Sequence, residues 1–302
     1  GLFEPEDTSS PYAWLDTASG SIVLDQWQIE NWLSFLPPYF RRTGSLDGAL
    51  QLHQGLDLEG EFRFADLGLR PSQSLPAVDT IGGRLRLSKN ILQIDQAGAE
   101  VGGSPIRLQG RIDLRNPQLP LWKFELAGEN IPIARTTEMI LRSDVEIHAV
   151  SEDADLPPLV AGNLKLRSGT LLVDFDPLGP SLTKGARVRP PFFHISEGPF
   201  ADWRFDLKIF GHDFMRVRSS YFKTRLSANL QLGGSFALPE LIGSVHTRGG
   251  ELHFPGAKFM LDDGEAFIEP SRPDVMQLQF SGIAQRSSRV IMMDVSNSLD
   301  DP

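Results

Sequence analysis

The 302-residue sequence contains no cysteine. Disulfide bonds, thiolate nucleophiles and cysteine-ligated metal sites are therefore excluded for this chain. Basic residues are also scarce, since 29 Lys and Arg stand against 39 Asp and Glu, which gives a formal net charge of −10. Because phosphate binding needs clustered basic side chains and no basic stripe is present, this balance argues against a nucleic-acid partner.

Long apolar runs are absent as well. No run reaches the length of about 18 apolar residues that a membrane-spanning helix needs. The first residues, from Gly1 to Pro5, lack the positive charge and the apolar core of a signal peptide. Because the sequence does not begin with Met, we expect it to be a piece of a longer protein.

Turn-forming residues are abundant. The sequence holds 28 Gly and 22 Pro, yet hydrophobic residues still make up 40% of it. That combination excludes disorder, because enough apolar surface is available to bury, and it favours many short strands joined by turns.

Apolar residues alternate with polar ones along most of the chain. From Leu226 to Leu232 the intervening residues are Ser227, Asn229 and Gln231. Such alternation predicts strands with one apolar and one solvated face. Because no long helical segments separate the strands, the pattern excludes a doubly wound α/β fold. We predict an all-β fold of consecutive antiparallel strands, with one solvated face and one apolar face that needs covering.

One stretch near the N-terminus has helix-like apolar spacing and ends at Pro37 and Pro38. Its apolar residues are Trp27, Ile29, Trp32, Leu33, Phe35 and Leu36. We expect one short helix there that covers the end of the sheet. A membrane-surface helix is the alternative, but Asp25 and Glu30 fit poorly against an anionic bilayer.

A Pro- and Gly-rich stretch provides the best internal boundary. Residues 176–191 read DPLGPSLTKGARVRPP and show no periodicity, which is uncommon within a compact domain. We therefore divide the chain into an N-terminal strand and helix at 1–43, a β-groove segment at 44–175, the loop at 176–191, and a second β-groove segment at 192–302.

The sequence offers little for catalysis or metal binding. His246 and His253 could face each other across a hairpin at Gly249 and Gly250, but solvated strand histidines are the simpler interpretation. Paired carboxylates such as Asp262 and Asp263 could serve glycoside hydrolysis, yet we place them in turns, where Asp suits the backbone. Asp263 and Gly264 are predicted to form one such turn between two strands. No serine nucleophile elbow or phosphate-binding Gly-rich loop occurs. We predict no catalytic residue, no metal and no cofactor.

The apolar side of the strands is the remaining candidate site. Its predicted members are Phe205, Leu207, Ile209, Leu226, Leu230, Leu232, Leu252, Phe254, Phe259, Leu261, Leu278 and Phe280. From alternation alone, an ordinary sandwich core without a ligand is the favoured interpretation.

The stretch from Gly233 to Met293 resembles the carboxy-terminal region of the TamB family, whose blocks have the form Pro-x-Leu/Ile-x-Gly, strand, Gly-x-Leu/Ile-x-Phe-Pro-Gly, Phe-x-Leu, Gly-x-Ala-x-Phe/Ile. The matching residues here are Leu230, Gly233, Gly234, Pro239, Leu241, Gly243, Val245, Gly250, Leu252, Phe254, Pro255, Gly256, Phe259, Leu261, Gly264, Ala266 and Ile268. Two upstream segments are similar to the AsmA-like relatives of TamB: GSLDGALQLHQGLDLEGEFRF from Gly44, and GGSPIRLQGRIDL from Gly102 running on to ENIPIAR.

The resemblance implies an elongated, curled antiparallel sheet with an apolar interior, a β-taco or repeating β-groove. This groove would shield phospholipid acyl chains as they cross the periplasm between the inner and outer membranes. It also implies a BamA-like outer-membrane barrel protein as partner, and an inner-membrane anchor elsewhere in the full-length protein. With the resemblance, lipid-groove lining becomes the favoured role for the twelve apolar residues. Two alternatives stay open: a periplasmic scaffold or chaperone that assembles outer-membrane proteins by strand addition, and a β-solenoid polysaccharide-active enzyme.

Overall fold

The computed structural model describes residues 19–28, 43–54, 57–69, 77–116, 118–136, 139–153, 155–172, 201–254, 257–270, 276–286 and 289–298. Within these ranges the protein contains fifteen strands and no helix. The strands are β1 (Gly20–Gln28), β2 (Ser45–His53), β3 (Asp57–Leu69), β4 (Val78–Ser88), β5 (Ile91–Val101), β6 (Ser104–Asp113), β7 (Leu121–Arg135), β8 (Met139–Ser151), β9 (Leu159–Leu172), β10 (Arg204–Arg218), β11 (Phe222–Gly234), β12 (Pro239–Phe254), β13 (Ala257–Ile268), β14 (Met276–Arg286) and β15 (Arg289–Ser298).

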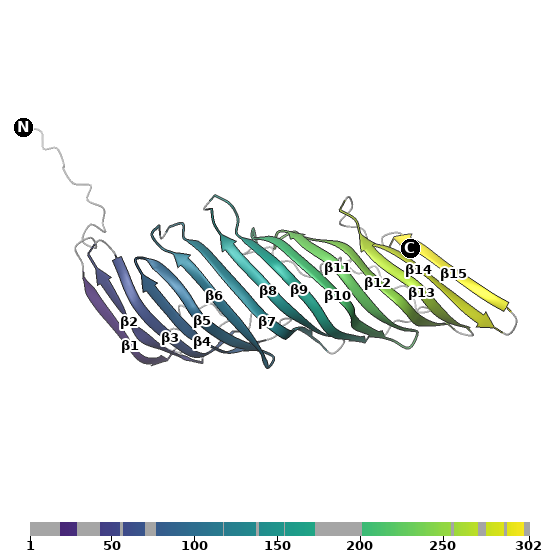
Figure 1. The fold of residues 1–302 in the computed structure, drawn as a ribbon, viewed down its shortest axis with the longest axis horizontal. Coiled ribbons are helices and arrows are strands. Elements are labelled where there is room, and N and C mark those ends of the chain that lie inside the picture. The colour runs from purple at the N-terminus through teal and green to yellow at the C-terminus, as the bar shows by residue number, and fades with distance from the viewer. Residues whose placement is uncertain are drawn as a thin grey trace, which may run out of the picture.

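All fifteen strands form one elongated sheet whose spatial order follows the chain from β1 to β15 (Figure 1). All neighbouring strands except β9 and β10 are antiparallel, as the tight turns between most of them require. At the β4–β5 turn, for example, Lys89 and Asn90 have φ values of 49° and 58°, as a two-residue β-hairpin turn requires. The all-β prediction and the mainly antiparallel pairing are therefore confirmed.

One pair departs from the predicted antiparallel arrangement. Strands β9 and β10 are parallel, with Leu207 of β10 registered to Gly162 of β9. A parallel pair needs a long crossover connection, which the residues between Leu172 and Arg204 provide. The predicted loop at 176–191 falls within this connection and lies outside the described residues. Side-chain alternation carries no information on strand direction, so the sequence pattern could not reveal this pair.

The two faces of the sheet differ sharply in chemistry. One row of registered neighbours is apolar and crosses seven strands, from β6 to β12: Leu108, Leu126, Ile147, Gly162, Leu207, Leu232 and Leu241. The adjacent row, one residue away along each strand, lies on the other face and is mostly polar: Arg107, Ala127, Glu146, Asn163, Lys208 and Gln231. Because successive strand residues point to opposite faces, the alternation in the sequence separates these rows.

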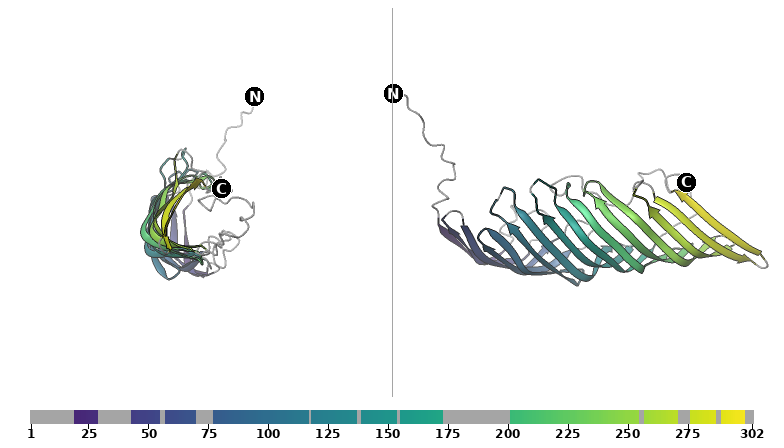
Figure 2. Two further views of the ribbon diagram at one scale, coloured as in Figure 1. Left: turned by 90° about the vertical axis from the view of Figure 1, so that its right-hand side faces the viewer. Right: turned by 45° about the horizontal axis from the view of Figure 1, so that its top comes forward.

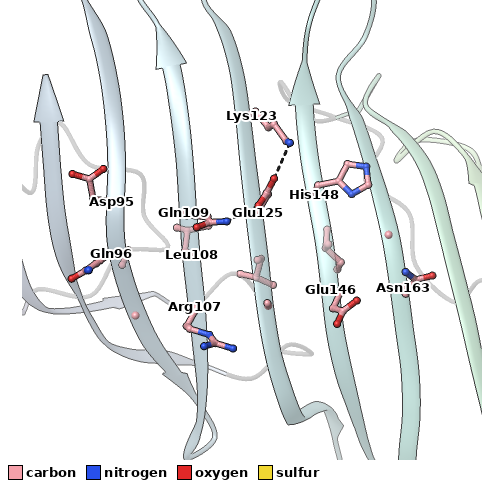
Figure 3. Close-up of a pocket in the computed structure, with 16 residues that line it drawn as sticks. Asp95, Gln96, Arg107, Leu108, Gln109, Lys123, Glu125, Glu146, His148 and Asn163 are labelled. Atoms are coloured by element: carbon pink, nitrogen blue, oxygen red, sulfur yellow. Dashed lines mark hydrogen bonds and ion pairs between the residues drawn. The ribbon is translucent and has the colours of Figure 1, made fainter. Parts of the chain in front are cut away.

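The sheet is bowed, so that one face is concave and the other convex (Figure 2). It is neither closed nor strongly curled, which corrects the extent of curling predicted from the sequence. Strands β5 to β9 run in the same order and direction in Figures 1 and 3, so both figures show the same face. That face is the convex one in Figure 2, and the side chains labelled on it in Figure 3 are polar, apart from Leu108 of the apolar row. The apolar row therefore lies on the concave face.

β-Bulges interrupt the pairing of many strands, and several place a non-glycine residue at positive φ. Asn130 of β7 and Asp213 of β10 have φ values of 54° and 47°. Side chains on neighbouring strands bind the backbone N–H groups at these bulges: Asp144 Oδ1 accepts from Asn130 at 3.0 Å, and Ser227 Oγ accepts from Asp213 at 2.9 Å. Because a bulge bends its strand and increases the local twist, these positions contribute to the bow of the sheet.

Two local predictions were wrong, and a third, the short helix, falls mostly on residues that the structure does not describe. Gly249 and Gly250 lie inside β12 instead of forming a hairpin, so His246 and His253 share one strand. The predicted turn at Asp263 and Gly264 is instead continuous strand in β13. The predicted helix overlaps the end of β1, which contains its first residue, Trp27, while its part beyond Gln28 lies outside the described residues.

Candidate functional site

The concave face carries three clusters of apolar side chains. The first centres on Leu166, Phe214, Met215, Val217 and Ala228, where β9, β10 and β11 adjoin. The second contains Val101, Ile106, Ile131 and Val145, contributed by β5 to β8. The third contains Phe205, Leu207 and Leu232, on β10 and β11. Apolar packing on this face therefore extends from β5 to β11 and is not confined to one end.

Beyond these clusters the concave face forms an open hollow of about 450 Å³ between β10 and β14. Its lining is almost entirely apolar. Five predicted residues line it: Leu226, Leu252, Leu261, Leu278 and Phe280. Apolar residues that the sequence analysis did not single out contribute as well: Val217, Phe222, Val245 and Ala266. Val245 and Ala266 could have been found from the alternation, because each stands at an every-second-residue position on the apolar side of its strand.

The structure brings most of the other predicted residues to the same face. Phe205, Leu207 and Leu232 form the third cluster, and Ile209 packs against it. Leu230 packs against the first cluster and is registered with Ile209. Phe259 is buried and is registered with Leu252 of the hollow. Phe254 is registered with Ala257, and its side chain lies outside the described residues.

Aromatic rings gather on the apolar face beside the third cluster. Phe205 and Phe236 stack with ring centroids 4.1 Å apart, and Trp203 meets Phe236 edge to face at 6.2 Å. Trp122 of β7 lies 5.0 Å from Trp203 and 5.3 Å from Phe124. These contacts join β7 to the start of β10, across the ends of β8 and β9.

Polar groups on the concave face have partners. Thr224 and Thr247 are 8% and 6% exposed, and their hydroxyl groups are hydrogen-bonded to each other. Both hydroxyls also approach the carbonyl oxygen of Gly249, at 2.8 and 3.0 Å. Ser143 is fully buried and donates to the carbonyl oxygen of Lys165 at 3.0 Å. Such satisfied hydroxyls add no free charge to the apolar surface.

The convex face has a hollow of a different kind, with a volume of about 790 Å³ (Figure 3). At its rim, Lys123 Nζ lies 2.8 Å from Glu125 Oε1, and Gln109 Nε2 donates to Glu125 Oε2 at 2.6 Å. The hydrogen bonds from Lys123 and Gln109 lower the pKa of the Glu125 carboxyl group. The side chains are solvated and of mixed charge, so this hollow has the properties of an ordinary wet sheet face.

Carboxylates and histidines do not converge on a catalytic or metal-binding centre in the described part of the chain. No group of three His, Asp or Glu residues with metal-ligand geometry occurs there. Asp262 and Asp263 lie next to a bulge in β13 and not in the predicted turn. His253 instead pairs with Glu251, at 3.1 Å from Nε2 to Oε2. Nor does any helix among these residues have the length and apolarity to cross a membrane.

Comparison with known families agrees with this architecture. The TamB C-terminal domain family matches residues 95–301, which is more than half of the chain. This protein belongs to the TamB C-terminal domain family. The membership implies a role in the translocation and assembly module and a place in the cell envelope, and the family is in general non-enzymatic. No curated protein matches the sequence.

Proposed function

We propose that the concave face of this TamB domain binds the acyl chains of phospholipids. The domain would then be a non-enzymatic section of a bridge-like lipid transport protein, located in the periplasm and held at the inner membrane by the rest of the full-length chain. The observation that carries this proposal is the continuous apolar lining of the bowed face, which ends in the open hollow of about 450 Å³. Covering apolar surface is favourable by about 25 cal/mol per Å², and an acyl chain can supply the cover.

The lining favours a hydrocarbon ligand over a polar one. Most lining residues of the hollow that belong to the concave face have apolar side chains. The others are Gly264, Ser219 and Thr247, whose hydroxyl is hydrogen-bonded. Glu265 and Gln279 also border it, but they are registered with each other on the convex parity. A lipid headgroup would therefore lie outside the hollow, in water, while its acyl chains follow the concave face.

A photocrosslinking experiment tests this proposal. A photoreactive amino acid replaces Leu278 on the concave face or Gln277, its neighbour on the convex face, in the 302-residue chain. Each protein is irradiated with vesicles of phosphatidylethanolamine and phosphatidylglycerol, and crosslinked lipid is detected by mass spectrometry. We expect lipid adducts at position 278 and none at 277. Equal labelling at both positions, or none at 278, would contradict the proposal.

Charge substitutions provide an independent test. Leu230 and Leu278 are only partly buried, so an aspartate at either position can remain hydrated while the sheet folds. We expect Leu230→Asp and Leu278→Asp to lose most of the lipid that copurifies with the protein, as measured by native mass spectrometry. Asn229→Asp, one residue away on the convex face, should retain it. Circular dichroism establishes that each variant is folded.

A second candidate function rests on the edge strand β15. Its Val290 and Met292 side chains are 59% and 79% exposed, and its described neighbour is β14 alone. An apolar edge strand can accept another strand, as a scaffold for outer-membrane proteins or a contact with a BamA-like barrel would require. Because the chain has no cysteine, a single Met292→Cys substitution permits disulfide crosslinking to unfolded barrel proteins carrying one cysteine. Failure to crosslink above the level of a His53→Cys control would exclude this function.

A further inference from the structure

Phenylalanines on the concave face are repeatedly registered with a glycine on the adjacent strand. The four pairs are Phe62 with Gly48, Phe64 with Gly83, Phe124 with Gly110, and Phe280 with Gly264. They occur at four different places between β2 and β14. In each pair the phenylalanine faces no side chain on the glycine's strand, while its other neighbouring strand presents Leu85, Leu46, Ala149 or Val295, respectively.

Two of the rings, those of Phe62 and Phe124, occupy space that a side chain in place of the glycine would take. A Cβ atom at Gly110 would lie 2.3 Å from Cδ1 of Phe124, and one at Gly48 would lie 2.6 Å from Cδ1 of Phe62. Carbon atoms in favourable contact are about 3.5–4.0 Å apart. The rings of Phe62 and Phe124 therefore lie close over the backbone of their glycine partners. At Gly264 the nearest Phe280 atom is its Cβ, so this pair shares the register and the close approach of the two strands.

We propose that these glycines set the clearance of the concave face, by which we mean the free space above the sheet that is open to acyl chains. A larger residue opposite a phenylalanine would push the ring away from the sheet and into the space for the ligand. With glycine there, the ring can pack against the strand backbone and the concave surface stays even. If a second sheet covered this face, projecting side chains of the two sheets would interdigitate, as in a β-sandwich. The inference rests on the proposed lipid-binding function, and it names the positions that control how freely lipid fits.

Gly264 is the best position for a test, because it lines the hollow together with Phe280. Its φ lies outside the left-handed region, so other residues can adopt its backbone conformation. A Cβ atom there would lie 3.0 Å from Cγ2 of Thr247 and 3.3 Å from Cβ of Phe280, contacts that small shifts can relieve. An alanine at position 264 would pack more closely against Thr247 and Phe280, and a leucine there would extend into the hollow.

Gly233 offers a matched control. It lies near the end of β11, at a position that belongs to the convex face, and is registered with Glu240. A Cβ atom there would meet nothing within 4 Å. A leucine at position 233 adds the same side chain as a leucine at 264, but on the other face. Any general effect of replacing a strand glycine should appear in both variants.

The experiment measures lipid adducts at a photoreactive residue in position 278, with the same phosphatidylethanolamine and phosphatidylglycerol vesicles. We expect Gly264→Leu to reduce the yield several-fold, Gly264→Ala to reduce it less, and Gly233→Leu to leave it unchanged. Adding Phe280→Ala to Gly264→Leu should recover much of the yield, because it removes the displaced ring.

The outcomes separate this inference from the function on which it rests. If the parent protein captures no lipid, the proposed function fails. If the parent captures lipid and folded Gly264→Leu captures as much, the clearance proposal is overturned and the lipid-binding function stands. Should Gly264→Leu fail to fold, Gly264→Ala decides the matter, and an undiminished yield from that folded variant would overturn the proposal.

Discussion

The concave and convex faces of this sheet are built from neighbouring residues of the same strands, yet they differ in almost every physical respect. Leu207 and Leu232 on the concave face are 5% and 4% exposed. Their chain neighbours Lys208 and Gln231 are exposed on the convex face, where Gln231 donates to Asp206. A shift of one residue in register would exchange the two faces, so the alternation fixes both the register and the site.

The comparison indicates where stability and function reside. Burial of apolar side chains on the concave face supplies the main favourable free energy of folding. The ion pairs of the convex face, such as Lys123 with Glu125, lie in water, where solvent and salt screen them. Removal of apolar side chains from the concave face should therefore affect both stability and lipid binding, whereas substitution of exposed convex side chains that do not support the backbone should change stability little.

The sharpest test of this difference uses two adjacent residues of β11. We expect Leu232→Ala to lower the free energy of unfolding by about 2–5 kcal/mol, because it leaves a cavity in the third apolar cluster. Gln231→Ala, on the convex face, should change it by about 0.5 kcal/mol or less. Urea unfolding followed by circular dichroism measures both. Similar losses for the two variants would contradict the assignment of stability to the concave face.

Asp144 tests whether a convex residue can matter when it supports the backbone. It accepts hydrogen bonds from the N–H of Asn130 at the β7 bulge and from Arg167 Nε at 2.6 Å. We expect Asp144→Asn to cost about 1–2 kcal/mol of unfolding free energy, because Arg167 loses its charged partner. Urea titration at neutral pH measures the loss, and Asp206→Asn, on the exposed part of the same face, is the control.

The pH dependence of the Asp144 effect follows from its pKa. Burial opposes ionisation, but the hydrogen bonds from Asn130 and Arg167 outweigh it and lower the pKa below the usual range. A carboxyl group with a lowered folded-state pKa stabilises above its unfolded pKa of about 3.9, and this stabilisation is lost as the pH falls through the folded value. The difference between the parent and Asp144→Asn should therefore shrink in acid. A constant difference would rule out the carboxylate charge as its source.

Thr247 provides a smaller test on the concave face. Replacing it with Val removes the hydroxyl that is shared with Thr224, while Thr224 keeps the carbonyl of Gly249 as acceptor. We expect a loss of about 1 kcal/mol in unfolding free energy and no loss of lipid adducts, because the hollow becomes more apolar. Thr170→Val on the convex face serves as control. A fall in lipid capture by folded Thr247→Val would show that the hydroxyl contacts the ligand.

Sequence alternation predicted the all-β class and the sorting of residues onto two faces, because both depend only on neighbours along the chain. The strands that contain Phe205 to Ile209 and Leu226 to Leu232 lie where the pattern placed them. The family resemblance was confirmed over residues 95–301. It also drew attention to the stretch from Gly233 to Met293, in which the apolar hollow is largely located.

Glycine was the main source of error. Gly264 was interpreted as a turn signal, yet it lies within β13, opposite Phe280 of the next strand. Whether a glycine marks a turn or makes room for a ring depends on the residue registered with it, and local composition does not contain that information. The parallel pairing of β9 and β10 depends in the same way on partners that are distant in the sequence, and so do the positions of the bulges.

The smallest expected effect concerns Glu251 on the convex face. Lys258 Nζ lies 2.7 Å from its Oε1, and the hydrogen bonds from Lys258 and His253 lower its pKa. Stabilisation from this carboxylate is present above the unfolded pKa of about 4.3 and disappears as the pH falls through the folded value. Because Lys258 is half exposed, we expect Glu251→Gln to shift the urea midpoint less than Thr247→Val does, and still less in high salt. A larger shift than that of Thr247→Val would mean that convex ion pairs share the stabilising role assigned here to the concave face.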